Sequence, residues 1–291
     1  MIVVTGATGV VGGLVARELA ARGEPFRIVV RDADRAPDLS GAEIAVATYD
    51  DVEALAAALE PDDRVFMVSM HAPYAERIAL HRSFVEVAAR RQVGRVVYLS
   101  FIAAGPDASF VHARSHGATE AMLRESGLSS CAVRNGMYGD VIESWFDDDG
   151  RITGPGGDGR VSFSHRPELG EAIAVLLAEP SHDGREIVTI TTPDAVSLSE
   201  LAALATDVTG DLYRFEPLER EEWIAYRRSL GRPDWSIEAG ISYYDGVASG
   251  EADVVSDDYR ELTGKPPRSV RDLIGQSRDE LPLARKGRHD T

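Results

Sequence analysis

The sequence predicts an α/β protein with a doubly wound parallel sheet and a smaller C-terminal α/β lobe. Three observations support this fold class. Short apolar runs alternate with helical patterns, a glycine-rich turn follows the first run, and the pattern changes near Asp147. Alternating strands and helices are typical of βαβ units. With 291 residues, 44% of them hydrophobic, the chain can bury one large core, or a large core and a small one.

Six apolar runs predict the strands of the sheet, at residues 2–5, 26–30, 44–48, 65–69, 96–100 and 130–134. Helical patterns begin near Val10, Asp51, Tyr74, His112 and Glu168. Right-handed crossovers place the carboxyl ends of parallel strands along one edge, where such sheets bind ligands. We therefore expect the functional residues where the strands end.

Two turn-rich segments, 147–150 and 154–159, predict a boundary near residue 150. We expect a large domain at 1–150, a smaller and partly interleaved lobe at 151–280, and a disordered tail at 281–291. Within the lobe, 187–191 predicts a strand, and 197–207 and 220–230 predict helices. The first of these helices opens on a capping box from Ser197 to Glu200.

The first strand runs directly into a G-x-x-G-x-x-G turn, which a helical pattern follows at once. The first glycine allows a tight turn, the second leaves room for phosphates, and the third lets helix and strand pack closely. The helix N-terminus adds free N–H groups and partial positive charge. The competing interpretation is a purely structural turn, but the correct flanks favour a Rossmann-type dinucleotide site. Its predicted cofactor contacts are Gly6, Thr8, Gly9, Val10, Val11 and Gly12.

The end of the second strand indicates which dinucleotide binds. An NAD-selective site carries an acidic residue there, whereas this strand ends in Arg31, with Arg35 nearby. A guanidinium suits the 2′-phosphate of NADPH. Asp32 would repel that phosphate if it pointed inward, and both charges could instead be solvated. NADPH is the favoured cofactor. Asp50, after the third strand, is expected near the adenine, and Ser69 and Met70 beside the cofactor's middle.

Composition argues against several other classes of protein. No apolar stretch approaches the ~20 residues that span a bilayer. The first residues already form a strand, so we expect no signal peptide and a cytoplasmic protein. The net charge of −17 opposes nucleic-acid binding, and the basic ending 285–289 is expected to be part of the tail. Cys131, the single cysteine, lies in an apolar run and is interpreted as a core residue. The seven histidines are scattered, so no metal site is expected.

Beyond the glycine turn and Arg31, three segments follow a known pattern: Tyr98-Leu99-Ser100, His116-Gly117-Ala118-Thr119-Glu120-Ala121-Met122-Leu123 and Arg134-Asn135-Gly136-Met137-Tyr138. With them the chain resembles, over residues 1–275, an atypical short-chain dehydrogenase/reductase of the NmrA-like group, in particular the bacterial NAD(P)H:quinone oxidoreductases. The resemblance implies NADPH-dependent reduction of a quinone-like or other carbonyl compound. It also implies that Asn135 and Gly136 lie against the nicotinamide, and that Ser100 contacts the cofactor.

The chain departs from the wider superfamily in its acid–base residues. Its two lysines, Lys265 and Lys286, lie far downstream, so the usual Tyr-x-x-x-Lys pair is absent. Phe101 stands where many relatives have a second small polar residue. A quinone needs little acid help, whereas the alkoxide formed from a simple ketone needs a donor. The candidate catalytic donors are His112, His116 and Tyr138, with His71 more distant.

Each of these donors has a structural alternative. His112 could be a solvated residue at a helix start, His116 a structural hydrogen-bonding group, and Tyr138 part of a pocket wall. The aromatic residues Trp223, Tyr226, Trp235, Tyr243 and Tyr244 could line a pocket for a flat substrate.

Three functions fit these observations. The favoured one is a monomeric or homodimeric reductase of small quinone-like molecules. The others are a non-catalytic NADP(H)-binding redox sensor of the NmrA type and a biosynthetic ketone or imine reductase.

Overall fold

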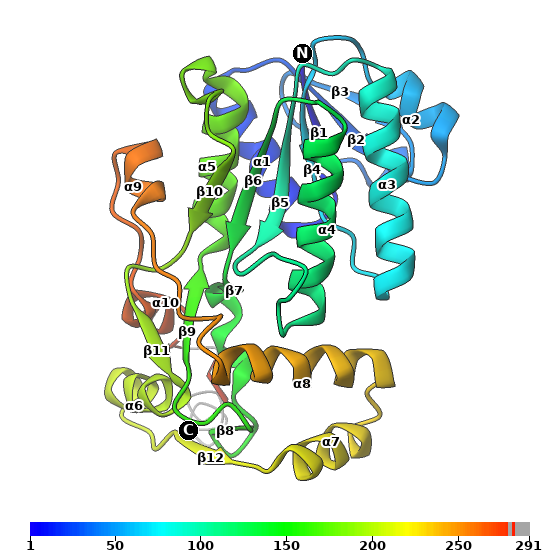
Figure 1. Cartoon of the computed structure of the whole chain (residues 1–291). Coiled ribbons are helices and arrows are strands. Elements are labelled where there is room, and N and C mark those ends of the chain that lie inside the picture. The colour runs from blue at the N-terminus through cyan, green and yellow to red at the C-terminus, as the bar shows by residue number, and fades with distance from the viewer. Residues whose placement is uncertain (279–280, 283–291) are drawn as a thin grey trace.

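The computed structural model describes residues 1–278 and 281–282, and a seven-stranded sheet forms its upper half (Figure 1). The strand order is β10-β6-β5-β4-β1-β2-β3, and every neighbouring pair is parallel. The strands are β1 (Ile2–Thr5), β2 (Phe26–Val30), β3 (Ala42–Val46), β4 (Arg64–Met67), β5 (Arg95–Phe101), β6 (Ser130–Asn135) and β10 (Ile187–Ile190). The predicted doubly wound parallel sheet is confirmed, and its order reverses between β1 and β4.

Helices cover both faces of this sheet (Figure 1). On one face lie α1 (Val10–Arg22) and α5 (Arg166–Ala178), with α9 (Asp258–Thr263) against α5. On the other lie α2 (Val52–Ala58), α3 (Tyr74–Arg90) and α4 (Val111–Glu125). Successive residues of β1 point to opposite faces, so Val4 packs in the first core and Val3 in the second. Burial on both faces explains why the inner strands can be recognised in the sequence as continuous apolar runs.

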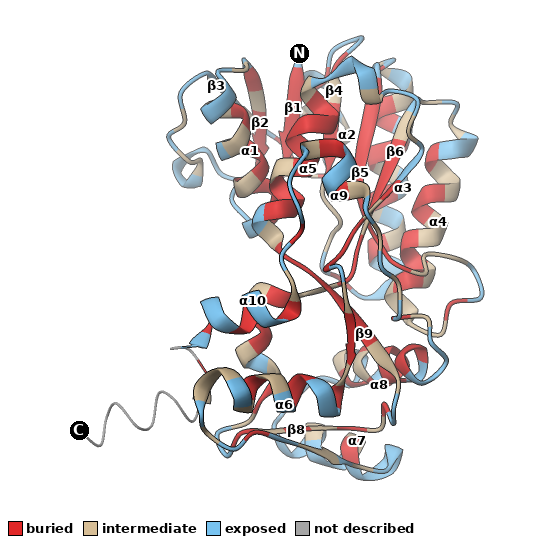
Figure 2. Ribbon diagram, turned by 90° about the vertical axis from the view of Figure 1, so that its left-hand side faces the viewer, coloured by how far each residue is buried: buried red, intermediate tan, exposed pale blue. Residues whose placement is uncertain are grey.

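Below the sheet, the lobe has its own apolar core (Figure 2). One small sheet joins β7 (Met137–Tyr138), β9 (Arg160–Ser164) and β11 (Ala195–Ser197), and another joins β8 (Arg151–Gly154) and β12 (Arg214–Pro217). The lobe's helices are α6 (Leu198–Thr209), α7 (Arg220–Ser229), α8 (Asp234–Ala248) and α10 (Val270–Gln276). Short 3₁₀ helices are η1 (Ala33–Arg35), η2 (Gly139–Trp145) and η3 (Pro180–His182).

Several predicted boundaries were wrong. The third strand starts at Ala42 and ends at Val46 rather than covering 44–48, and the fourth ends at Met67 rather than Ser69. Helix α5 begins at Arg166 rather than near Glu168, because the proline at position 167 is tolerated in the first turn of a helix. Strands β7, β8, β9, β11 and β12 and helices α8, α9 and α10 were not predicted.

Elements beyond residue 150 return to the large sheet. Helix α5 packs on α1, and β10 extends the sheet next to β6. The two units are therefore interleaved in sequence, and the division near residue 150 stays a prediction. Leu281, where the predicted tail begins, is buried in the lobe's core. The rest of that tail, including the basic ending 285–289, lies outside the described residues apart from Pro282.

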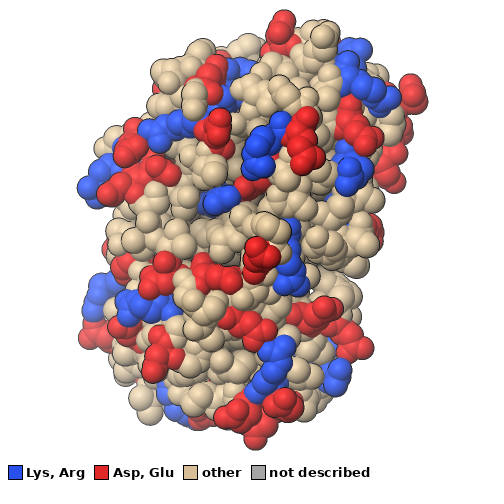
Figure 3. Space-filling view, in the orientation of Figure 1, with Lys and Arg blue, Asp and Glu red and all other residues tan. Residues whose placement is uncertain are grey.

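Cys131 is a core residue, as predicted. It is fully buried, and burial raises the pKa of its thiol to about 11. Within the described residues, no helix is long and apolar enough to cross a bilayer. No group of three or more His, Cys, Asp or Glu side chains there is arranged to hold a metal ion. Acidic and basic side chains are interspersed over the face in Figure 3.

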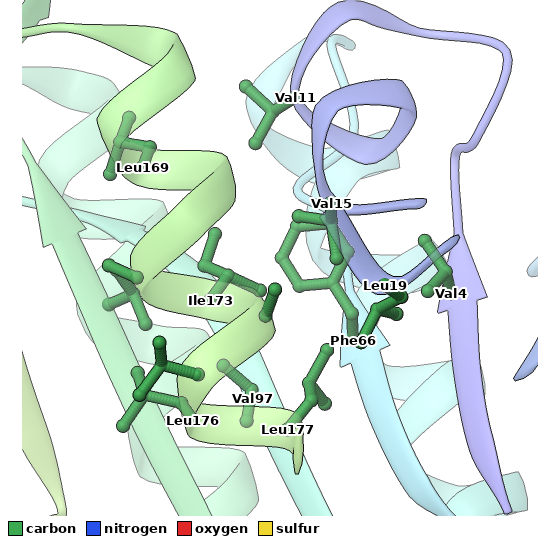
Figure 4. Close-up of a cluster of buried hydrophobic side chains, with 14 of the residues drawn as sticks. Val4, Val11, Val15, Leu19, Phe66, Val97, Leu169, Ile173, Leu176 and Leu177 are labelled. Atoms are coloured by element: carbon green, nitrogen blue, oxygen red, sulfur yellow. The ribbon is translucent and has the colours of Figure 1, made fainter. Parts of the chain in front are cut away.

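Helices α1 and α5 approach each other closely at Gly170 (Figure 4). A Cβ at Gly170 would lie 2.7 Å from Leu14 Cβ and 3.2 Å from the Leu14 carbonyl carbon. Because both atoms belong to or adjoin the backbone of α1, they cannot move aside without moving the helix. Val11 on α1 and Leu169 and Ile173 on α5 belong to the same apolar core.

Two helical glycines make a matched test of this packing. Gly170→Ala is expected to lower the free energy of unfolding by about 1–3 kcal/mol through overpacking. A Cβ at Gly275 in α10 would meet no atom within 4 Å, so Gly275→Ala should raise stability by about 0.5–1 kcal/mol through helix propensity. Urea unfolding of both variants measures the difference. Equal effects of the two substitutions would contradict the tight α1–α5 contact.

Candidate active site

The glycine turn links β1 to α1 at the carboxyl edge of the sheet. Gly6 has a φ of +68°, and a Cβ at Gly12 would lie 2.3 Å from the Gly6 carbonyl oxygen. Only glycines allow this approach of helix to strand. Gly9 caps α1 without a side chain, and Thr8, Gly9 and Val10 are exposed while Val11 and Gly12 are buried. The turn therefore presents backbone and free helix N–H groups to the edge.

The end of β2 carries two exposed guanidinium groups. Neither Arg31 nor Arg35 forms an ion pair with another described residue. The Asp32 carboxylate, which could have opposed a phosphate, accepts a hydrogen bond of 3.0 Å from the Asp34 N–H and caps η1. Two unpaired cations thus lie where the ribose phosphate was predicted.

Asp50 lies four residues beyond β3 and is exposed. Hydrogen bonds, first from the Thr48 side chain and then from backbone, hold the pKa of its carboxyl below the usual value. At the end of β4, the Met70 N–H donates to His81 Nε2 at 3.0 Å, and Ser69 Oγ contacts Arg77. Ser69 and Met70 are therefore held by groups on α3.

Residues at the ends of β5 and β6 form hydrogen bonds inside the protein. Ser100 is fully buried, and its hydroxyl donates to Glu120 at 2.6 Å, while Glu120 also binds Arg134 at 2.6 Å. Its side chain is engaged inside the protein, so a contact of Ser100 with the cofactor stays a prediction. The Gly136 N–H donates to Ser164 Oγ at 2.7 Å, and a Cβ there would lie 2.5 Å from the Ser162 carbonyl oxygen.

The predicted donor His116 is buried, and both of its ring nitrogens are used. Nε2 lies 2.6 Å from Arg77 Nη2, and Nδ1 lies 2.8 Å from the Tyr98 hydroxyl. Arginine can only donate, so Nε2 must accept and the imidazole proton sits on Nδ1. Burial, reinforced by the charge of Arg77, holds the pKa of His116 well below 6.5. His116 is therefore neutral at neutral pH.

A second buried histidine, His81, was missed in the sequence. Its Nε2 accepts from Met70 N–H, so Nδ1 carries the proton toward Thr119 Oγ1 at 2.8 Å. Burial first, and then the charge of Arg77, lower the pKa of His81 to about 3. It joins α3 to α4 and fixes the end of β4.

The remaining candidates surround the same guanidinium. Burial, then Arg77, then His71 lower the pKa of His112 to about 4, and its Nδ1 is buried without a partner. Burial raises the pKa of Tyr138, which the charges of Arg166 and Arg77 partly offset. The structure thus brings His112, His116 and Tyr138 around Arg77, with His71 near His112. Their roles as catalytic donors stay predictions.

An aromatic cavity of about 280 Å³ opens in the lobe next to Met137. Its walls include Trp145, Trp223, Tyr226, Tyr243 and Tyr244. Four of the five aromatic residues that were predicted to line a pocket therefore line this cavity. The fifth, Trp235, instead packs against His71 with ring centroids 5.4 Å apart. A series of ring contacts runs from Trp145 through Tyr243 and Phe110 to His112.

A family model described as NAD(P)H-binding matches residues 6–180. The chain belongs to this NAD(P)H-binding family. The structure of an NADPH-dependent quinone oxidoreductase of Escherichia coli with NADPH has a TM-score of 0.87 and 26% identity, covering 95% of this chain and 99% of that one. The triphenylmethane reductase of Citrobacter sp. with NADP(H) has a TM-score of 0.86 and 27% identity, covering 95% and 100%.

A Streptomyces griseus enzyme, (4-alkanoyl-5-oxo-2,5-dihydrofuran-3-yl)methyl phosphate reductase, is 32% identical over 94% of this chain and 96% of its own length. The predicted resemblance to NmrA-like oxidoreductases and the predicted NAD(P)H cofactor are confirmed. The residues of this NAD(P)H-binding protein also fit the cofactor. The space that a Cβ would fill at Gly12 is closed by backbone, and Arg31 and Arg35 offer unpaired charge.

Sequence reasoning missed Arg77 and His81, which both lie on α3, because no motif marks either residue. Their spacing of four residues was the one available signal, since it places them on the same helix face. Nothing in the sequence pairs them with α4.

His81 makes the NAD(P)H-binding fold sensitive to acid. The unfolded chain binds a proton at His81 near pH 6.5, and the folded chain binds one only near pH 3. The contribution of neutral His81 to folding stability is therefore fully present above pH 6.5 and is lost as the pH falls toward 3. Between about pH 5.5 and 4, where the unfolded but not the folded state holds this proton, His81 alone should lower the free energy of unfolding by about 1.4 kcal/mol per pH unit. Urea unfolding at several pH values measures this slope.

In His81→Gln the side-chain oxygen can still accept from Met70 N–H, but the proton uptake is gone. The slope of this variant is expected to be flatter by that amount. Identical slopes for His81→Gln and wild type would mean that His81 titrates normally in the folded state.

Proposed function

We propose that this protein is an NADPH-dependent reductase that transfers a hydride to quinones or related conjugated carbonyl compounds. The observation that carries the proposal is the hydrogen bonding of His116, whose ring nitrogens are both engaged, Nε2 with Arg77 and Nδ1 with Tyr98, so that it has no further proton to donate. His112 and His116 are neutral at neutral pH, and Tyr138 keeps its proton. A site without a strong acid suits an acceptor whose reduced anion is stable in itself, and a hydroquinonate is such an anion.

The aromatic cavity supports a flat acceptor. Trp145, Trp223 and Tyr243 offer ring faces and edges within the cavity beside Met137, which follows the Asn135–Gly136 turn. Aromatic walls bind planar conjugated molecules over a large apolar area. Relatives named for quinones, for triphenylmethane and for a 5-oxo-2,5-dihydrofuran agree with conjugated acceptors as the substrate class.

In this proposal, different residues of the chain bind the cofactor and position the acceptor. The glycine turn and the N-terminus of α1 would bind the pyrophosphate, and Arg31 with Arg35 would bind the 2′-phosphate. The bound cofactor supplies a hydride. The aromatic walls would orient the acceptor and exclude water, and positioning of this kind can supply much of the rate.

Arg31→Ala is expected to reduce the preference for NADPH over NADH by about 10-fold to 100-fold in kcat/KM, because the bidentate contact to the 2′-phosphate is lost. Steady-state rates with both cofactors measure the ratio. Arg90→Ala, at the far end of α3, is the control for loss of one surface arginine. An unchanged ratio in Arg31→Ala would contradict the assigned phosphate site.

The substrate class is tested by NADPH oxidation with 1,4-benzoquinone, naphthoquinones, a simple ketone and a cyclic imine. Turnover of the quinones at least 100-fold faster than of the ketone is expected, since only the ketone's alkoxide requires an acid donor. Preference for the ketone or imine would contradict the proposal. Tight NADPH binding without turnover of any acceptor would replace it with a redox-sensing role.

A further inference from the structure

Arg77 carries a buried charge that no acidic residue balances within the part of the chain that the structure describes. Its side chain is 5% exposed, and it forms no ion pair with any carboxylate among the described residues. Nη2 binds Ser69 Oγ and His116 Nε2, which are both neutral, and Nε is buried without a partner. An isolated buried cation is costly unless an anion or several hydrogen bonds compensate it. The arrangement therefore points to an anion that arrives with a ligand.

The position of Arg77 indicates which anion this is. Its neighbours are Ser69 at the end of β4, His116 and His112 on α4, and Tyr138 just beyond the Asn135–Gly136 turn. That turn is where the reacting end of the cofactor is predicted. The exposed side chains of Arg31 and Arg35, in contrast, lie after β2 with the phosphate-binding features. Arg77 thus lies apart from them, toward the reacting end.

We propose that Arg77 is the group that stabilises the negative oxygen formed on the acceptor during reduction, in place of the missing Tyr-x-x-x-Lys pair. This inference rests on the proposed reductase function. Ser69 and His116 are positioning residues, because their hydrogen bonds fix the direction of the guanidinium. His116 can hold Arg77 only as a neutral acceptor, which its proton on Nδ1 ensures.

The chemistry balances without a protein acid. The hydride gives a quinone one proton and two electrons, so the nicotinamide is left oxidised and the quinone becomes a hydroquinonate with one negative oxygen. Arg77 stabilises that charge electrostatically as it forms. Water then supplies the proton that completes the hydroquinone.

Arg77→Gln and Arg77→Lys test this role, with Arg82→Gln as matched control on the exposed side of the same helix. Single-turnover NADPH oxidation at saturating cofactor is measured for a series of benzoquinones whose hydroquinones differ in acidity. Arg77→Gln should slow hydride transfer by about 100-fold, the usual effect of removing one oxyanion donor. The loss should be largest for quinones that give the most basic hydroquinonate. Arg77→Lys should lose less than about 10-fold, and Arg82→Gln should match wild type.

A second measurement covers the case in which Arg77→Gln does not fold. 4-Nitrophenol, a ring with one ionisable oxygen, is titrated in its complex with NADP⁺ and protein. In wild type its pKa should fall by about 1–3 units, as expected for an anion next to a cation. Arg77→Lys should largely preserve that shift, whereas a phenol pKa equal to that in water would overturn the proposal.

The outcomes separate this inference from the proposed function. If wild type reduces no quinone, the reductase function itself fails. If wild type reduces quinones and Arg77→Gln keeps the same rate and the same dependence on hydroquinone acidity, only the role of Arg77 is refuted. A weaker affinity for NADPH with an unchanged single-turnover rate would likewise overturn it, since Arg77 would then hold the cofactor.

Discussion

The close approach of α1 to β1 is the constraint on which the site depends. No side chain fits at Gly12, because the Gly6 carbonyl oxygen already occupies that space. The same contact sets the height of α1 on the sheet and so the position at which α5 packs against it through Gly170. Thr5 joins the end of β1 to the end of β4, since its Oγ1 accepts from Val68 N–H and donates to the Phe66 carbonyl. The glycine turn and the end of β4 are thereby held in one geometry.

A second constraint is electrostatic. Burial, reinforced by the charge of the Arg77 guanidinium, keeps three histidines from taking up a proton. Hydrogen-bond direction reinforces this effect, since Arg77 and the Met70 N–H each require a lone pair on the imidazole they face. The histidines are therefore better suited to orienting neighbours than to donating protons.

The sheet and the cofactor class could be predicted because local sequence determines them. Strands buried on both faces are continuous apolar runs, and the glycine turn has backbone requirements that few residues meet. The lobe was largely missed because its strands are short. Strand β7 has two residues and β11 has three, too few to show an alternation, and their pairing partners lie far away in the chain.

The candidate site was predicted only in part, for a related reason. His112, His116 and Tyr138 were named from motifs, but the residue that joins them lies on α3, more than thirty positions earlier. In isolation Arg77 is one charged residue in a helix with several others, and such residues are usually solvated. Only the packing of α3 against α4 shows that it points inward. Ser100 was also named from a motif, and the fold bonds its hydroxyl to Glu120, so its contact with the cofactor stays a prediction.

The lobe also determines where α4 begins, which connects the aromatic cavity to the histidines. Phe110 caps α4 without a side-chain hydrogen bond, so the helix's first N–H groups need other acceptors. The lobe supplies one of them and also holds the residue before the cap: Ser242 Oγ on α8 accepts from Val111 N–H at 3.2 Å, and the Glu251 carboxylate accepts from Ser109 N–H. His112 and Tyr243 are held on either side of Phe110 by these bonds. Substitutions in the lobe's walls that changed which hydride acceptor binds would therefore also alter the start of α4. The choice of hydride acceptor and the placement of His112 cannot vary independently.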